Sequence, residues 1–213
     1  MNPGDSLRDT LGGIDIYLLD QVVKGRITPD MTILDAGCGG GRNLIYLASQ
    51  GAQVWGVDRS KERVQRAFRA VAEVAPETPS DRFRCEGVEA LTLEDSSFDV
   101  VICSAVLHFA TGPDHFHQML DQIWRVLRLE GLLFCRLASN IGIEDAVVPQ
   151  ANGWYSLPDG SERFLVDEAT LLDAGRRLGA ELLEPLKTTN VQGLRCMTTW
   201  VVRKSGQALA TGA

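Results

Sequence analysis

Apolar residues in this chain occur both as short continuous runs and at helical spacing. Short runs bounded by turn residues are typical of strands buried on both faces of a parallel sheet. They predict strands at 32–36, 53–58, 82–86, 98–104 and 132–137. Apolar residues three and four apart predict helices at 14–24, 41–49, 61–74 and 114–128. Strands that alternate with helices over short connections predict a parallel sheet with right-handed crossovers.

The pattern changes after the fifth predicted strand. Residues 139–163 are rich in Gly and Pro and are expected to form one long loop, which in a compact domain is usually functional. Asp167 is then expected to cap a helix that ends near Leu178. Two late strands, at 181–189 and 195–203, are expected to form an antiparallel pair at one sheet edge.

Composition narrows the class of protein. A chain of 213 residues with 45% hydrophobic and 23% charged residues is typical of one globular domain. No apolar run is long enough to span a bilayer, and no signal peptide is visible. A net charge of −7 disfavours nucleic acid as a partner, and five widely spaced cysteines suit a reducing cytoplasm. We therefore expect a cytoplasmic protein, a monomer or homodimer, with a small-molecule partner and no membrane contact.

A glycine-rich turn joins the strand at 32–36 to the following helix. Strand, glycine turn and helix form a nucleotide-like binding site at the carboxyl end of a strand. Gly37, Gly39 and Gly41 give G-x-G-x-G, and Arg42 occupies the place where a dinucleotide fingerprint needs a small residue. Asp35, two residues before the first glycine, suits a ligand that carries an ammonium group. These features favour S-adenosylmethionine (SAM) over NAD or FAD.

The stretch 33–41 resembles motif I of the class I SAM-dependent methyltransferases. Residues 38–43, followed by Tyr46-Leu47-Ala48 and Gly51, are similar to the tellurite-resistance and small-molecule (methyltransferase type 11-like) group. The resemblance extends over roughly residues 12–138. It implies a Rossmann-like α/β fold: a mostly parallel seven-stranded sheet with an antiparallel edge pair and helices on both faces. A single domain is expected over 1–204, with a disordered tail at 205–213.

The expected cofactor site combines spacing and resemblance. Asp58 follows Gly37 by 21 residues, the spacing of an acid that binds ribose hydroxyls. Relatives usually carry an acid at the position of Gly87, where either Glu86 or Glu89 is a candidate substitute. The residues expected to bind SAM, and its product S-adenosylhomocysteine (SAH), are Asp35, Gly37, Cys38, Gly39, Arg42, Asp58, Arg59, Gly87, Val88 and Ser104.

The resemblance also suggests where the methyl acceptor binds. A helix over 12–25 is expected to fold over the site, and the insertion at 139–163 is expected to cover the acceptor as a lid. His108 is a candidate general base, or else a hydrogen-bonded histidine that orders its loop. Candidate acceptor contacts, each with a packing or surface ion-pair alternative, are Tyr17 (also a candidate catalytic residue), Trp154, Tyr155 and Arg195. The i, i+2 spacing of the histidines at 115 and 117 predicts no metal site.

Three functions remain open from the sequence. The first is methyl transfer from SAM to a small-molecule acceptor by in-line displacement. The second is a SAM-binding scaffold or sensor without catalysis, which the departure at Gly87 keeps open. The third is a nicotinamide-dependent oxidoreductase, which Arg42 argues against. The identity of the acceptor is not readable from the sequence.

Overall fold

The predicted strands pair into one mixed sheet in the computed structural model, which describes residue 7 and residues 9–206. The helices are α2 (Ile16–Val23), α3 (Arg42–Ser49), α4 (Lys61–Val74), α5 (Pro113–Val126) and α6 (Glu168–Leu178). The main-sheet strands are β1 (Thr32–Ala36), β2 (Gln53–Asp58), β3 (Phe83–Cys85), β4 (Phe98–Ser104), β5 (Leu127–Ser139), β9 (Ala180–Leu182), β10 (Lys187–Val191) and β11 (Arg195–Lys204).

The strand order is β3-β2-β1-β4-β5-β11-β10, and β9 pairs with β11 as an eighth strand. Strands β3, β2, β1, β4 and β5 are parallel, whereas β11 is antiparallel to β5 and β10 is antiparallel to β11. This arrangement confirms the predicted mostly parallel sheet with an antiparallel edge pair. The order reverses between β1 and β4, and ligands of open α/β sheets bind at the carboxyl ends of strands beside such a reversal.

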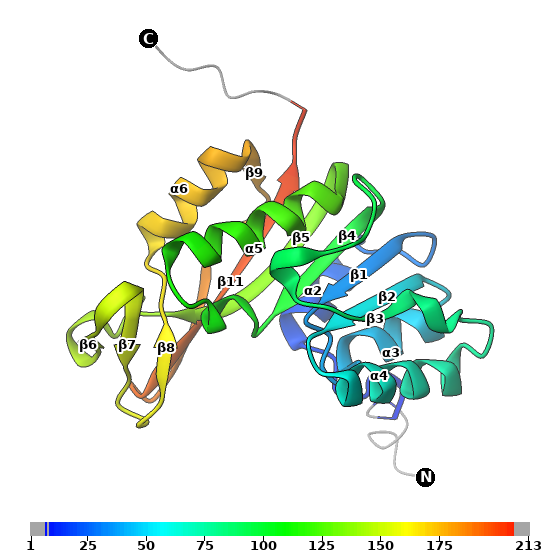
Figure 1. The fold of residues 1–213 in the computed structure, drawn as a ribbon, viewed down its shortest axis with the longest axis horizontal. Coiled ribbons are helices and arrows are strands. Elements are labelled where there is room, and N and C mark those ends of the chain that lie inside the picture. Colours follow the sequence, from blue (N-terminus) through cyan, green and yellow to red (C-terminus); the bar gives the residue numbers. More distant parts are fainter. Residues whose placement is uncertain (1–6, 8, 207–213) are drawn as a thin grey trace.

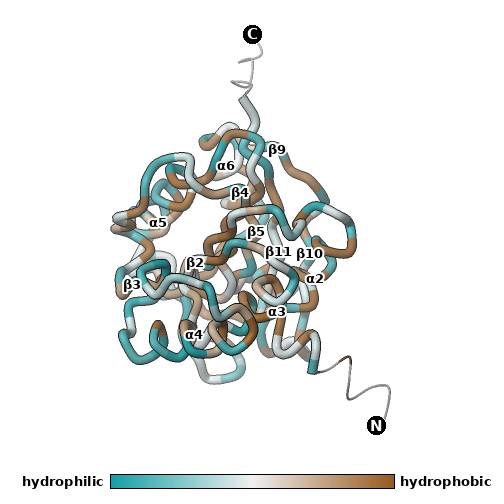
Figure 2. The backbone as a smooth tube through the Cα atoms, turned by 90° about the vertical axis from the view of Figure 1, so that its right-hand side faces the viewer, coloured by the Kyte–Doolittle hydropathy of each residue, from teal (hydrophilic) through white to brown (hydrophobic). Residues whose placement is uncertain are grey.

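Helices cover both faces of the sheet (Figure 1). Phe116 and Met119 of α5 and Leu171 of α6 belong to one buried cluster with Leu34 of β1. Leu18 of α2 and the apolar sides of α3 and α4 belong to a second cluster on the other face. In Figure 2 the outer helix α4 is largely teal while brown predominates near β5, as expected for central strands buried on both faces.

Side-chain caps explain why several predicted helix starts are confirmed. Asp15, at the N-cap of α2, accepts a hydrogen bond from the Tyr17 amide, and Ser60 accepts from the Arg63 amide at the start of α4. Asp167 accepts from the backbone amide of residue 170 at the start of α6, as predicted. Each cap satisfies an amide that the helix itself leaves without a partner.

The prediction of one long loop at 139–163 is wrong. The segment contains a small antiparallel sheet of β6 (Val148–Pro149), β7 (Trp154–Ser156) and β8 (Glu162–Phe164). Gly160, with φ of +80°, lies in the turn between β7 and β8. Strands of two or three residues are too short to produce an alternating pattern, so only the turn residues between them are visible in the sequence.

Two other predictions change at the C-terminal end. The single strand predicted at 181–189 is wrong, because β9 and β10 are separate strands that pair with different parts of β11. Most of the predicted tail, residues 207–213, lies outside the described residues. Within the described part of the chain, no helix has both the length and the apolar character needed to cross a membrane.

Candidate functional site

The glycine loop after β1 is fastened to the end of β2. The amides of Gly37 and Cys38 both donate to the carbonyl oxygen of Val57, at 2.8 Å each. Gly37 has φ of +89°, and a Cβ there would lie 2.3 Å from Cγ2 of Val106 in the loop after β4. Only glycine fits such a close approach. The loop is therefore held against the carboxyl ends of both neighbouring strands.

Asp58 at the end of β2 completes this loop. Its Oδ2 accepts from the Gly39 amide at 3.0 Å, and its Oδ1 accepts from the Ser60 amide at 2.9 Å. Gly39 has φ of +54°, and a Cβ there would meet nothing within 4 Å. The loop thus has an open side at Gly39. Each carboxylate oxygen of Asp58 keeps a lone pair with which it can accept a ligand hydroxyl.

Asp35 carries a carboxylate that accepts no hydrogen bond from the described residues. Its side chain is buried, and neither carboxylate oxygen has a hydrogen-bond partner among the described residues. Burial raises the pKa of Asp35 to about 7, against the opposing effects of the Arg42 guanidinium and of the nearby Asn43 amide, which falls outside hydrogen-bonding geometry. The Oγ of Ser104 on β4 is likewise buried and unpartnered. Buried polar groups normally have partners, so these atoms are available to a cationic or hydrogen-bond-donating group of a ligand.

The end of β3 carries a carboxylate beside Gly87. A Cβ on Gly87 would lie 2.3 Å from Oε1 of Glu89, which the 3-10 turn Val88–Ala90 folds back over it. Oε2 of Glu89 is buried without a hydrogen-bond partner within residues 9–206, while His115 lies 3.8 Å away. Glu86 instead accepts from the backbone and hydroxyl of Thr92. Oε1 of Glu86 also has no partner among the described residues, but Thr92 holds the Glu86 carboxylate through Oε2. Of the two candidate substitutes, Glu89 is the one whose carboxylate lies over Gly87.

Four other predicted cofactor residues differ in what they present. The Cys38 side chain is buried under the loop, so this residue offers only its backbone, and burial raises the pKa of its thiol. Arg42 begins α3 with its side chain 55% exposed. Arg59 is exposed just beyond β2. Val88 is buried in the 3-10 turn after β3.

His108 is buried in the loop after β4. Its Nδ1 accepts a hydrogen bond from the Ala138 amide at 3.2 Å, so the ring carries its proton on Nε2. Burial, with a smaller effect of Arg163, lowers the pKa of His108 to about 4. The neutral ring is therefore a hydrogen-bond donor on its free side, which favours the loop-ordering role over that of a base.

Tyr17 lies beside an arginine that the sequence analysis missed. The guanidinium of Arg136 on β5 lies 5.2 Å from the Tyr17 ring and donates to Asp15 at 3.1 Å. The Tyr17 hydroxyl shares a hydrogen bond of 2.7 Å with Thr189 on β10. A charged residue inside an otherwise apolar strand was the available signal for Arg136, because burial of a cation needs a reason.

The other acceptor candidates lie on or near the small sheet. Trp154 packs partly buried against the main core, and Tyr155 packs against a separate small apolar cluster. Arg195 is 59% exposed on its side chain and lies 3.7 Å from Asp159, which is the surface ion-pair alternative. Their contact with an acceptor stays a prediction.

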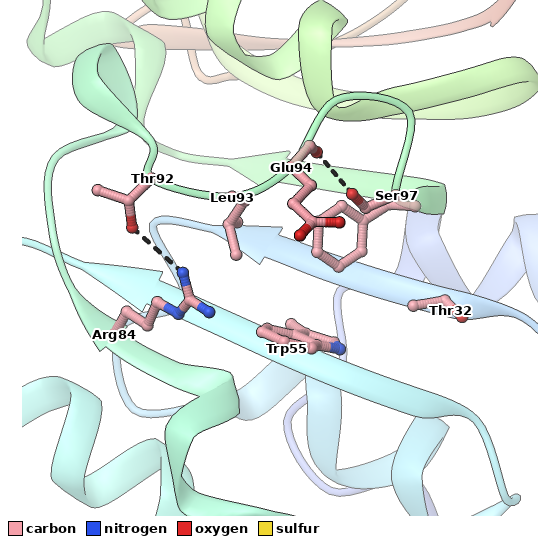
Figure 3. A pocket seen from close by; sticks show the side chains of 8 residues that line it. Thr32, Trp55, Arg84, Thr92, Leu93, Glu94 and Ser97 are labelled. Carbon is pink, nitrogen blue, oxygen red and sulfur yellow. Dashed lines mark hydrogen bonds between the residues drawn. The ribbon is translucent and has the colours of Figure 1, made fainter.

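A pocket of about 320 Å³ lies at the opposite end of the sheet from the glycine loop. Thr32 and Phe98, which begin β1 and β4, line it together with Trp55 and Arg84 (Figure 3). In Figure 3 the Arg84 guanidinium donates a hydrogen bond to Thr92, and it lies over the indole of Trp55. Because it opens at the amino ends of the strands, this pocket is separate from the glycine-loop site.

The sequence is similar to those of known methyltransferases. Residues 34–135 match the family model described as a methyltransferase domain. The chain is 30% identical over 161 residues to a ubiquinone biosynthesis O-methyltransferase of Maricaulis maris, covering 73% of this chain and 61% of the relative. It is 33% identical over 106 residues to an uncharacterized methyltransferase of Synechocystis, covering 50% of this chain and 46% of the relative. The matches therefore span about half to three fifths of the relatives' lengths.

Solved structures show the same fold. A SAM-dependent methyltransferase from Methanosarcina mazei superposes with a TM-score of 0.71 at 20% identity, over 87% of this chain and 98% of that one. Magnesium protoporphyrin IX methyltransferase from Synechocystis with bound SAM gives 0.63 at 20% identity, over 95% and 85%. The [4+2]-cyclase SpnF gives 0.66 at 17% identity, over 88% and 80%. The chain therefore has the fold of the class I SAM-dependent methyltransferases, and residues 34–135 within it match the methyltransferase domain model.

Proposed function

We propose that this chain is a SAM-dependent methyltransferase that acts on a small-molecule acceptor. The observation that carries the proposal is Asp35, whose buried carboxylate has no partner in the described structure and lies on β1 directly before the glycine loop. The ammonium group of SAM supplies the partner that this carboxylate lacks. A nicotinamide dinucleotide offers no such group at this position. The motif that binds dinucleotides also needs a small residue where Arg42 begins α3.

The remaining residues suit the other parts of SAM. Asp58 keeps acceptor capacity for the ribose hydroxyls, and the open side of Gly39 admits a ligand close to the backbone. Glu89 offers a free carboxylate oxygen at the end of β3 for the adenine amino group, with the Val88 backbone next to it. Arg42 at the start of α3 suits the carboxylate of the cofactor, because a helix N-terminus and a cation both favour an anion.

When bound, SAM supplies an activated methyl group on a sulfonium. SAH is a good leaving group, which drives the transfer. The protein must hold the acceptor nucleophile in line with the methyl group and exclude water. Tyr17 on α2 and the segment at 139–163 are proposed to border the acceptor. His108, neutral and donating from Nε2, is proposed to orient the loop after β4, so a reaction without a histidine base is favoured.

The rival that a specific observation favours is a SAM-binding protein with another activity or none. The fold does not determine the activity, and the [4+2]-cyclase SpnF shares it. Monomeric or homodimeric state, cytoplasmic location and lack of nucleic-acid binding belong to the proposal as well; the last rests on the net charge of −7.

The proposal is tested by turnover. Purified protein is incubated with SAM labelled on the methyl carbon and a panel of small phenols, thiols, amines and carboxylic acids, and SAH release is measured. Methyl transfer to any acceptor, lost in Asp58→Ala, supports the methyltransferase. Tight SAM binding without SAH release across the panel supports the scaffold instead.

A further inference from the structure

Three polar side chains form a row across the middle of the sheet. Ser104 on β4 and Thr199 on β11 are both register partners of Arg136 on β5. Register partners project to the same face. Oγ of Ser104, Nε of Arg136 and Oγ1 of Thr199 are all buried without a hydrogen-bond partner within the described structure. Buried polar atoms normally have partners, and three such atoms on adjacent strands can share one polar ligand.

Arg136 is held in place by its neighbours. Its guanidinium donates to Asp15 at 3.1 Å and lies 5.2 Å from the Tyr17 ring, with 21% of the side chain exposed. Tyr17 is itself fixed through its bond to Thr189. A planar guanidinium that is already oriented loses little freedom when it binds a carboxylate through two parallel hydrogen bonds.

Arg136 lies on a strand that is distant from the residues expected to bind the cofactor. Asp58 ends β2 and Asp35 lies on β1, while β5 lies two strands beyond β1, about 10 Å away at the usual strand spacing. Arg42, at the start of the helix that follows the glycine loop, is the cation closer to the cofactor. Arg136 is therefore left for a second ligand at the carboxyl end of β5.

The charges at the site call for an anion. Asp15 lies 3.1 Å from Arg136 and 3.9 Å from Arg42, so one carboxylate faces two guanidinium groups. An anionic group on the acceptor supplies a further negative charge beside Arg136, at a place where an uncompensated charge is costly.

We propose that the acceptor carries a carboxylate, or an anion of like shape, bound by Arg136 with the Thr199 hydroxyl beside it. This inference rests on the proposed methyltransferase function and names its substrate class. Arg136 is a specificity residue here, because it binds a group of the acceptor that is remote from the reacting atoms.

The test compares benzoate with benzamide, which have the same shape but differ in charge. Each is titrated into SAH-saturated wild type, Arg136→Gln and the matched control Arg177→Gln, whose exposed guanidinium pairs with Asp121 on α5. Because Arg136→Gln removes the cation that is hydrogen-bonded to Asp15, the double variant Asp15→Asn/Arg136→Gln is measured too. Thermal unfolding monitors folding. The wild type and Arg177→Gln are expected to prefer benzoate by about tenfold or more. Both Arg136 variants are expected to lose that preference while SAH affinity stays unchanged.

Other outcomes overturn the assignment. Equal binding of benzoate and benzamide to the wild type, or an unchanged preference in a folded Arg136 variant, contradicts a carboxylate site at Arg136. A tenfold loss of SAH affinity in Arg136→Gln, with unchanged affinity for 5′-methylthioadenosine, assigns Arg136 to the carboxylate of the cofactor. Failure of the wild type to bind SAH contradicts the proposed function instead, and the benzoate preference is then read from the ligand-free protein.

Discussion

The carboxylate of Glu89 lies over the backbone of Gly87, with Oε1 2.3 Å from the position that a Cβ on Gly87 would take. A side chain at 87 and the present position of Glu89 therefore exclude each other. The absence of an acid at 87 and the presence of one at 89 are two parts of a single arrangement. The 3-10 turn Val88–Ala90 brings the later carboxylate back to the end of β3.

This arrangement predicts that Glu89 binds the adenine amino group. The wild type should bind SAH about tenfold more tightly than S-inosylhomocysteine, in which a carbonyl replaces that amino group, because a carboxylate–carbonyl contact is repulsive. Glu89→Ala should abolish the preference, as measured by isothermal titration. Glu86→Ala is the matched control, since Thr92 holds Glu86 through Oε2 and Glu89 is the acid that lies over Gly87. A preference that survives in Glu89→Ala rules out this role for Glu89.

The raised pKa of Asp35 should give the protein an unusual dependence of stability on pH. Burial raises its pKa from 3.8 to about 7, so between these values the folded protein binds a proton that the unfolded chain releases. Its contribution to the free energy of unfolding is therefore full below about pH 4 and decreases as pH rises to 7, by on the order of 4 kcal/mol at most. Asp35→Asn should remove this loss and be more stable than the ligand-free wild type at pH 8, measured by urea denaturation.

The same substitution should weaken the binding of SAM. A neutral amide cannot form an ion pair with the ammonium group of SAM, so Asp35→Asn is expected to bind SAM at least tenfold more weakly at pH 8 while being better folded. In the wild type, SAM affinity should rise as pH increases toward 7 and then level off, because the ligand requires the ionised carboxylate. A variant that is more stable and binds SAM normally would show that Asp35 braces the loop without contacting the ligand.

Substitutions of Gly39 and of a second glycine distinguish the effect of backbone strain from the effect of blocking ligand access. Gly39 and Gly25 have φ of +54° and +68°, and a Cβ on either would meet nothing within 4 Å. Each Gly→Ala change should cost about 1 kcal/mol of stability, the strain of a left-handed alanine. Only Gly39→Ala should also reduce SAM affinity by tenfold or more, because its methyl group enters the open side of the loop. Equal SAM affinities in the two variants would place the ligand elsewhere.

The parts of the fold predicted from the sequence are those that neighbouring residues determine. The bounds of β1, β2 and β4 follow from apolar runs, and Asp167 caps α6 as expected because capping is local. The small sheet at 148–164 could not be predicted, since its strands form only through pairing with each other. For the same reason the division between β9 and β10 depends on how β11 accommodates both.

The candidate site shows the same limit. Asp35, Gly39 and Asp58 were identifiable because a fixed spacing around one turn brings them together. Arg136 was visible only as a charged residue in an apolar strand; its contacts were not, because the side chains around it reach it through sheet order and the docking of α2. Contacts between distant segments carry no local signal in a single sequence.

The central claim, that the glycine loop and Asp58 bind SAM, is tested most directly by isothermal titration. Wild type and Asp58→Ala are titrated with SAM, SAH and NADH, with Asp81→Ala, a carboxylate of an exposed 3-10 turn, as the matched control. We expect wild type and Asp81→Ala to bind SAM and SAH but not NADH, and Asp58→Ala to lose at least tenfold in both affinities. Binding of NADH in preference to SAM, or no binding of SAM and SAH at millimolar concentration, would contradict the claim.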